Sequence, residues 1–268
     1  MSLVSWQRRQ QISDGARTVG GWTGRAGVAG MARVIGTPRL IAWAVEAAPD
    51  PATTVGEVTR ELTPLLPVGP ADVVGNYLRG YVLLGRGGQE KPEMIFVQGG
   101  PRAVIDAASS HVPSRVRTHQ RRGDVRLVWD APVAEVVRRC GERPKTWIME
   151  PMPQLWEDLA GLGLARAVGA YRGTELVAGL WGIEVGRTFG IMSMFHRENA
   201  VGAVVLAGVV DAVPQRWDLV DCGAMNPNFA RYGAVEISPQ DFQRRVLAGL
   251  GPGGVGTGGV GPGVVGPG

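Results

Sequence analysis

Asp221 is the side chain with the clearest chemical capacity in this sequence of 268 residues. It lies in a run, residues 218–222, whose apolar pattern predicts a buried strand. A carboxylate there is costly unless it has a partner or a chemical role. It could accept or orient a proton during catalysis, and it could equally cap a turn. Residue type alone leaves both interpretations open.

Other common site chemistries find no support in the sequence. The histidines His111, His119 and His196 have no Cys or His partner at the spacing of zinc sites, so no metal is expected. Cys222 has no recognisable base and is better interpreted as a small buried residue. Because Cys140 is the only other cysteine, we expect reduced thiols in a cytoplasmic protein. A Gly-x-Ser-x-Gly elbow and a Lys-containing phosphate loop are both absent from the sequence.

Five arginines fall within twelve residues and are opposed there only by Asp124. Guanidinium groups pair bidentately with phosphate, so the cluster could hold a nucleic-acid backbone. The net charge is only +4, however, and a solvated arginine-rich loop is the simpler interpretation. The arginine cluster consists of Arg115, Arg117, Arg121, Arg122 and Arg126.

Hydrophobic periodicity and turn residues predict the elements that must position these groups. Three strands joined by short links predict an antiparallel meander, and strands and helices are segregated rather than alternating. This order predicts an α+β fold with a mostly antiparallel sheet flanked by helices. The predicted strands cover residues 125–129, 165–171, 175–185, 187–195 and 218–222, and the helices cover 40–48, 54–66, 70–79, 131–140, 152–162, 199–213, 228–232 and 239–247.

Composition predicts four segments. Residues 249–268 hold eleven Gly, three Pro and no charge, so a flexible, disordered tail is expected there. The longest apolar run, 200–210, is shorter than the roughly 20 residues that cross a bilayer, so no membrane association is expected. The remaining segments are an N-terminal extension without clear periodicity (1–52), a small N-terminal domain (53–122) and the main domain (123–248).

Five short segments, in order, resemble the leucyl/phenylalanyl-tRNA-protein transferases. The run from Arg187 to Arg197 is similar to that family's strand and turn around Gly-Glu-Ser-Met-Phe-Ser-Arg, and Leu219–Cys222 is similar to its Leu-Ile-Asp-Cys-Gln. The others are Thr146–Ile148, Glu175–Gly182 and Gly233–Ile237. The resemblance implies a GNAT-like acyltransferase core that moves an amino acid from aminoacyl-tRNA to the N-terminal amine of a protein. It implies no cofactor besides the aminoacyl-tRNA co-substrate, and a monomer is expected.

The resemblance also implies roles for individual residues. Asp221 would be the catalytic carboxylate, and the arginine cluster would contact tRNA phosphates without reading sequence. Tyr77, Trp147 and Trp156 would hold the 3′-terminal adenosine, since a base stacked on an aromatic ring is worth roughly 1–3 kcal/mol. The aminoacyl pocket would be lined by Leu180, Phe189, Met192, Val205, Gly208 and Ala212.

Several positions depart from the family pattern. Residues 82–84 are Val-Leu-Leu where the family has Phe-Pro-Trp, which removes one stacking wall. Met192 and Gly223 stand where the family has Glu and Gln around the substrate amine. A small-molecule amine acceptor, or an inactive tRNA-binding relative, therefore stays an alternative. An acyl-CoA N-acyltransferase is disfavoured because residues 196–202 lack the expected pyrophosphate loop, although a helix start can bind phosphate.

Overall fold

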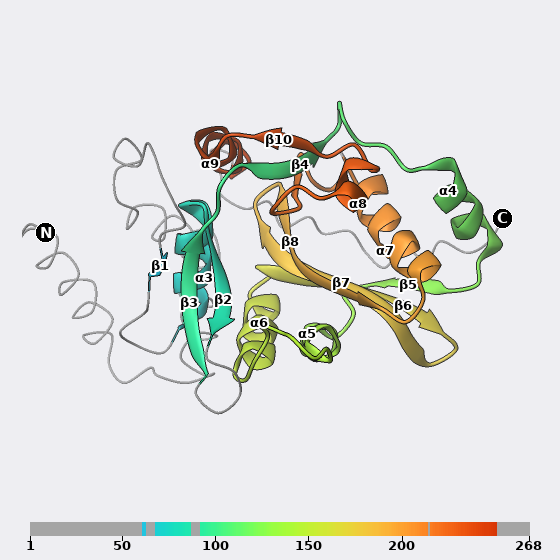
Figure 1. Ribbon diagram of the computed structural model, residues 1–268, viewed down its shortest axis with the longest axis horizontal. Helices are drawn as coiled ribbons and strands as arrows, with labels where there is room; N and C mark the ends of the chain where they lie inside the picture. Colours follow the sequence, from blue (N-terminus) through green and yellow to red (C-terminus); the bar gives the residue numbers. More distant parts are fainter. Residues whose placement is uncertain (1–60, 63–67, 87–91, 214, 251–268) are drawn as a thin grey trace, which may run out of the picture.

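Two sheets organise the chain in the computed structural model, which describes residues 61–62, 68–86, 92–213 and 215–250 (Figure 1). The smaller sheet is antiparallel and has three strands in the order β1-β3-β2. The larger has seven, in the order β10-β4-β9-β8-β7-β6-β5. The bounds in the smaller sheet are β1 Glu61–Leu62, β2 Tyr81–Arg86 and β3 Glu93–Gln98.

The larger sheet contains the meander expected from the sequence. Its neighbouring strands are antiparallel except for β8 and β9, which run parallel. The α7 helix connects these two strands, as a parallel pair requires a crossover. The bounds are β4 Arg102–Asp106, β5 Arg126–Trp129, β6 Ala165–Arg172, β7 Glu175–Val185, β8 Thr188–His196, β9 Leu219–Asp221 and β10 Val235–Ile237.

Helices cover both faces of the larger sheet (Figure 1). The α5 and α6 helices pack on one face, and α7, with α4 against it, packs on the other. The α3 helix packs on β2 and contacts α6 and α9, so it joins the smaller sheet to the main layer. The bounds are α3 Pro70–Leu78, α4 Ser114–Arg122, α5 Val133–Gly141, α6 Met152–Gly161, α7 Asn199–Asp211, α8 Pro227–Ala230 and α9 Pro239–Ala248.

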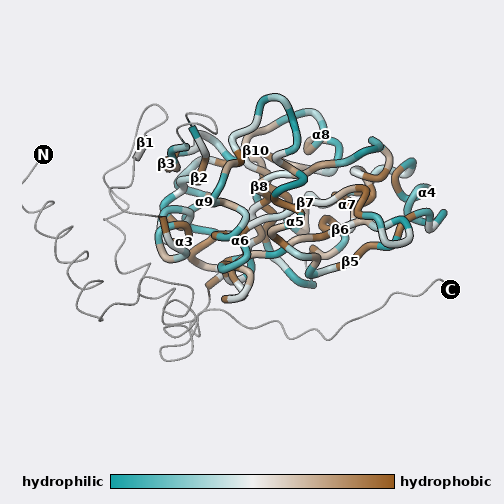
Figure 2. Tube along the Cα trace, turned by 90° about the horizontal axis from the view of Figure 1, so that it is seen from below, coloured by the Kyte–Doolittle hydropathy of each residue, from teal (hydrophilic) through white to brown (hydrophobic). Residues whose placement is uncertain are grey.

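The larger sheet separates two hydrophobic cores, because successive strand side chains point to opposite faces. Trp156 and Trp181 lie in the core under α5 and α6. Leu180, Phe189 and Trp217 lie in the core under α7. Figure 2 shows the hydrophobic stretches inside and hydrophilic loops outside. The two adjacent residues Leu180 and Trp181 therefore belong to different environments.

The α+β class predicted from the sequence is confirmed, and most predicted elements within the described ranges are present. The sequence pattern missed β2, β3, β4, α4 and β10. The helix predicted over 54–66 is wrong at Glu61–Leu62, which pair with β3 as a strand. The rest of that helix, the helix predicted over 40–48 and the tail from 251 lie outside the described residues. The chain leaves the smaller sheet after Gln98 and enters the larger sheet at Arg102, because β4 pairs with β9. This change of sheet comes before residue 122, where the sequence analysis ends the small N-terminal domain.

Gly182 provides a test of the packing between β7 and β8. A Cβ atom there would lie 2.1 Å from the Gly190 carbonyl oxygen, which belongs to the backbone and cannot move away cheaply. We expect Gly182→Ala to lower the free energy of unfolding by about 1–3 kcal/mol. Urea unfolding measures this change.

The matched control is Gly161→Ala, at the end of α6, where a Cβ would meet nothing within 4 Å. In that helical position alanine is favoured over glycine by up to about 1 kcal/mol, so the control should be neutral or stabilised. Equal unfolding midpoints for the two variants would contradict the close approach of β7 and β8.

Candidate functional site

Asp221 lies at the centre of a buried hydrogen-bonded cluster. Its Oδ2 atom accepts from the Tyr77 hydroxyl at 3.0 Å and from Arg102 Nη1 at 3.2 Å. Its Oδ1 atom accepts from the Gly223 backbone N–H at 2.8 Å. Asp221 is only 2% exposed. The carboxylate thus has partners on both oxygens, and the cost of burying its charge is offset by a cation and two neutral donors.

Three elements bring these groups together. Asp221 is the last residue of β9, and its neighbours in the sheet are Val104 of β4 and Gly190 of β8. Tyr77 reaches it from the last turn of α3, in the layer of the smaller sheet. Gly190 is required there, because a Cβ would lie 2.4 Å from the Tyr77 hydroxyl oxygen. The missing side chain of Gly190 therefore leaves the space that the Tyr77 hydroxyl occupies against the sheet.

Arg102 is the member of this cluster that the sequence analysis missed. It begins β4, and its side chain is 5% exposed. Besides Asp221 it donates from Nη2 to the Gly80 carbonyl at 2.8 Å, and its guanidinium lies 4.8 Å from the centre of the Phe242 ring. The sequence offers one weak signal: a cation placed directly before an apolar run that ends in a second charged residue, Asp106.

Tyr77 is held in its protonated form. Burial, followed by the charge of Asp221, raises the pKa of the Tyr77 hydroxyl well above its usual value. The hydroxyl therefore stays a donor to the carboxylate through the physiological range. Its oxygen keeps lone pairs that can accept a further hydrogen bond. The pair can thus receive a proton from a group placed on the far side of Tyr77.

A small hollow lies beside Tyr77, between the smaller sheet and the main layer. It has room for about one water molecule. Met192 faces it from β8, two residues after Gly190 and so on the same face of the strand. A bulge lies at this position, since Trp181 pairs with Ser193 and Gly182 with Ile191, which leaves Met192 without an opposing residue. The lining is Val73, Tyr77, Tyr81, Val82, Leu83, Trp156, Ile183 and Met192.

Of the three predicted adenosine residues, Tyr77 and Trp156 line this hollow and Trp147 does not, and they differ in exposure. Trp156 is fully buried and packs edge-on to Trp181, with ring centres 4.4 Å apart. It therefore offers no free face for stacking in this structure. Trp147 is half-buried and lies 6.2 Å from Trp181. Tyr77 is buried and binds Asp221 through its hydroxyl.

Most residues of the predicted aminoacyl pocket lie on the opposite face of the sheet. Leu180, Phe189 and Val205 are fully buried in the core under α7, against which Ala212 also packs. The Phe189 ring stacks on Trp217 at 4.5 Å and 16°. A Cβ on Gly208 would lie 2.9 Å from Leu127. Met192 alone faces the hollow, so the structure does not bring the six residues together.

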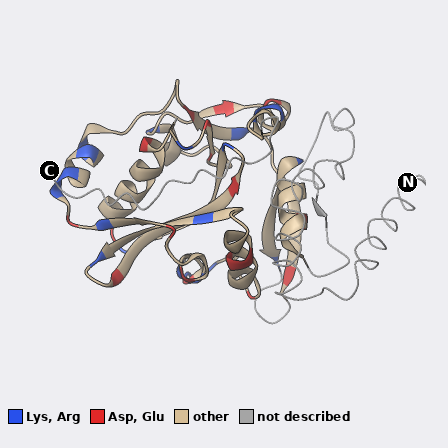
Figure 3. Cartoon of the chain, turned by 180° about the vertical axis from the view of Figure 1, so that it is seen from behind, with Lys and Arg blue, Asp and Glu red and all other residues tan. Residues whose placement is uncertain are grey.

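The arginine cluster lies at the other end of the molecule, on and after α4 (Figures 1 and 3). Arg115, Arg121 and Arg122 are exposed. Arg117 forms an ion pair with Asp211 at 2.6 Å, and Arg126 lies over the Tyr171 ring at 5.5 Å. Four of the five guanidinium groups, all but that of Arg117, therefore have no acidic partner among the described residues.

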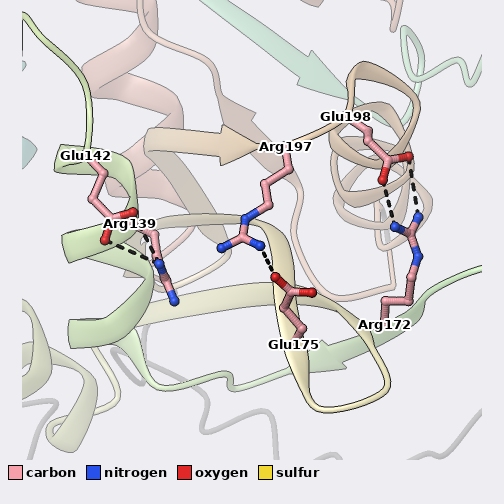
Figure 4. A network of polar contacts seen from close by, with 6 residues as sticks. All are labelled: Arg139, Glu142, Arg172, Glu175, Arg197 and Glu198. Carbon is pink, nitrogen blue, oxygen red and sulfur yellow. Dashed lines mark hydrogen bonds and ion pairs between the residues drawn. The ribbon is translucent and has the colours of Figure 1, made fainter.

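Several other arginines are neutralised at the surface. Figure 4 shows three such pairs, Arg139–Glu142, Arg172–Glu198 and Arg197–Glu175. Their side chains are between 34% and 60% exposed. Exposed pairs of this kind contribute at most about 1 kcal/mol each. They reduce the local positive charge without fixing the fold.

Two further properties concern cofactors and membranes. Among the described residues no group of three or more His, Cys, Asp and Glu side chains could hold a metal ion. Within the same ranges no helix is both long and apolar enough to cross a bilayer.

An α+β layer with a buried carboxylate–hydroxyl pair beside an apolar hollow suits the transfer of an already activated acyl group, a reaction that depends on positioning. The family model for leucyl/phenylalanyl-tRNA protein transferase matches residues 104–247. The chain belongs to this family of aminoacyltransferases.

Individual relatives agree with that assignment. The leucyl/phenylalanyl-tRNA–protein transferase of Rubrobacter xylanophilus is 33% identical over 184 residues, which cover 68% of this chain and 94% of that protein. The corresponding transferase of Hyphomonas neptunium is 30% identical over 187 residues, covering 68% and 72%. That of Caulobacter vibrioides is 29% identical over 184 residues, covering 67% and 84%.

The two cysteines give a test of the buried environment around this site. Both are free and buried. Burial raises the pKa of Cys140 to about 12 and that of Cys222 well above its usual value, with Asp221 a second cause for Cys222. The reactive thiolate is therefore scarce at pH 8. We expect no rapid reaction with Ellman's reagent in the native protein and two reactive thiols in guanidinium chloride.

The raised thiol pKa values also set how the stability of the protein changes with pH. Each folded pKa lies above the unfolded value, so the free energy of unfolding should fall as pH rises above about 8.5. Cys140→Ala should make this decline shallower. A native thiol that reacts as fast as free cysteine would contradict the buried placement.

Proposed function

We propose that this chain transfers an aminoacyl group from aminoacyl-tRNA to the N-terminal amine of a protein, forming an amide. The observation that carries the proposal is the contact of Tyr77 with Asp221, in a chain that belongs to the transferase family. Asp221 comes from a segment that resembles the family, and Tyr77 is one of the residues to which the resemblance gives a role. The 3′ end of the tRNA would bind between the smaller sheet and the main layer, where the hollow lies.

The reaction needs little chemistry from the protein. The amine nitrogen attacks the ester carbonyl, the new C–N bond forms, and the bond to the ribose oxygen breaks. One proton passes from the amine to that oxygen, so no external base is consumed. An activated ester mainly requires the two reactants to be held at attack distance. The chain's residues therefore have to orient the groups and guide one proton.

Asp221 acts in this scheme through Tyr77. Its oxygens already accept from Arg102, Tyr77 and Gly223, so the carboxylate is not free to approach the amine directly. The Tyr77 hydroxyl donates to Asp221 and can accept from the amine on its other side. In this relay the Tyr77 oxygen takes the amine proton as the Tyr77 proton passes to Asp221, and the reverse shift returns one proton to the ribose oxygen that leaves, so Asp221 ends ionised and paired with Arg102.

The predicted tRNA-binding roles apply to fewer residues than the sequence analysis named. Trp147, which is half-buried and in ring contact with Trp181, is the candidate for stacking on the terminal adenosine. The exposed arginines of α4 are candidates for tRNA phosphates farther along the molecule. The aminoacyl pocket, the four-segment domain division, the GNAT-like label and the monomeric state stay predictions.

Replacing the carboxylate tests the catalytic role. We expect Asp221→Asn to slow transfer from charged tRNA about 10²–10⁴-fold, because general acid–base groups contribute on that scale. Transfer is measured with tRNA carrying labelled leucine or phenylalanine and peptides that begin with different residues, alongside small amines. Because the variant leaves Arg102 without its counter-ion, thermal melting must first show that it is folded at the assay temperature. Labelled tRNA should then bind to the folded variant with unchanged affinity in a filter assay. A retained rate would end the assignment of Asp221.

Tyr77→Phe is the companion variant in the same assay. It removes the hydroxyl but keeps the ring that packs edge-on to Phe242 at 5.7 Å. The relay predicts a loss of rate similar to that of Asp221→Asn, and a double variant no slower than the worse single one. Independent, additive losses would show that the two residues do not act in one relay.

The salt dependence of tRNA binding tests the α4 surface. We expect Arg121→Ala with Arg122→Ala to weaken binding and to lower the slope of log K against log salt by about 1.5, since each phosphate contact contributes about 0.7–0.9. The matched control is Arg138→Ala with Arg139→Ala on α5, which removes the same charge from the other face of the sheet. Equal slopes for the two double variants would remove α4 from the tRNA site.

A further inference from the structure

Two buried indole N–H groups lack a hydrogen-bond partner within the described part of the chain, those of Trp156 and Trp181. Buried donors are nearly always paired, because an unpaired one costs about 1–3 kcal/mol. An unpaired donor in a well-packed core therefore needs an explanation. The two residues lie in contact, yet their surroundings differ.

Trp156 lines the hollow beside Tyr77, and Trp181 is not among the residues that form its wall. The Trp181 indole interacts with the Cys140 thiol, whose sulfur is a weak hydrogen-bond acceptor. The rest of the hollow is apolar apart from the tyrosine hydroxyls of Tyr77 and Tyr81. A ligand atom that enters the hollow thus comes next to the ring of Trp156, whose Nε1–H has no partner, to the Tyr81 side chain, and to the Tyr77 side chain, whose hydroxyl is bound to Asp221.

We infer that the Trp156 indole N–H donates to the carbonyl oxygen of the transferred aminoacyl group. This inference rests on the proposed function and adds a residue that stabilises its transition state. When the amine attacks, the carbonyl electrons move to oxygen, which becomes negative. Collapse restores the C=O bond and expels the ribose oxygen, which takes the proton. A donor fixed at the oxygen favours the charged stage over the ground state.

The packing of Trp156 suits this task. Its ring is fully buried and held edge-on by Trp181, so its N–H direction is fixed before the substrate arrives. A donor that needs no rearrangement at the moment of reaction contributes most in a water-poor site. Tyr77, on another wall of the same hollow, would then serve the amine while Trp156 serves the carbonyl oxygen.

The experiment removes the N–H group without changing the side-chain volume. Trp156 is replaced by 3-benzothienylalanine, in which sulfur takes the place of the indole N–H, and Trp156→Phe is made in parallel. Trp181 receives the same two replacements as matched controls. Steady-state transfer from phenylalanyl-tRNA to a peptide amine gives kcat and KM, and thermal melting reports on folding.

The inference expects the Trp156 replacement to lower kcat about 10²–10³-fold, the loss seen when one oxyanion donor is removed, with KM nearly constant. The Trp181 replacement should leave both values unchanged, with a similar melting temperature. If the wild type transfers and the Trp156 analogue is equally fast, the inference is overturned while the proposed function stands. Equal losses at both positions would indicate a packing role and would also overturn it.

A second readout does not depend on turnover. In protein labelled with ¹⁵N-tryptophan, addition of a 3′-amide analogue of phenylalanyl-adenosine should move the Trp156 indole resonance downfield and leave that of Trp181 in place. A Trp156 resonance that does not move at saturating analogue overturns the inference. A wild type without transfer activity that still shows the shift would count against the proposed function and not against the donor.

Discussion

The buried ion pair between Arg102 and Asp221 is the interaction on which the arrangement of the site depends. The two residues are 119 positions apart in the sequence and lie on neighbouring strands, β4 and β9. Removing either partner would leave a buried charge unpaired, at a cost of about 3–5 kcal/mol. Neither residue can therefore be lost alone. The pair fixes the end of β9 and, through it, the direction of the carboxylate.

The same pair also attaches the smaller sheet to the larger one. Arg102 donates to the carbonyl of Gly80, directly before β2, and Asp221 accepts from Tyr77 of α3. Phe242 of α9 closes the cluster, with its ring against both Arg102 and Tyr77. Segments from the beginning, middle and end of the described chain thus meet at two charged groups. The candidate site lies at this junction because the junction sets the position of the Tyr77 hydroxyl.

The fold was largely predictable because its central elements have strong local patterns. The strands β6, β7 and β8 are largely apolar runs separated by short turns, and α7 is a long apolar helix. The site was predictable only in part. Asp221 and Tyr77 were identified through the resemblance to the family, whereas Arg102 is a lone cation whose partner is distant in sequence. The bulge at Met192 has no local signature either.

The strand period explains why the predicted aminoacyl pocket is not assembled with the tryptophans. Leu180 and Trp181 are consecutive in β7, so they must point to opposite faces. Phe189 and Leu180 then share the α7 face of the sheet. Trp217 lies in the same core and stacks on the Phe189 ring. A ligand in contact with both Trp156 and Phe189 would have to pass through the sheet.

The hollow beside Tyr77 holds about one water molecule, whereas an aminoacyl-adenosine is many times larger. The wall on one side is formed by α3 and β2, and the wall on the other by α6, β7 and Met192 of β8. If the proposed function holds, binding has to separate these walls. The side chains that line both walls are mostly apolar, so the substrate's own rings can replace their contacts, while Arg102 still links Asp221 of β9 to the Gly80 carbonyl before β2.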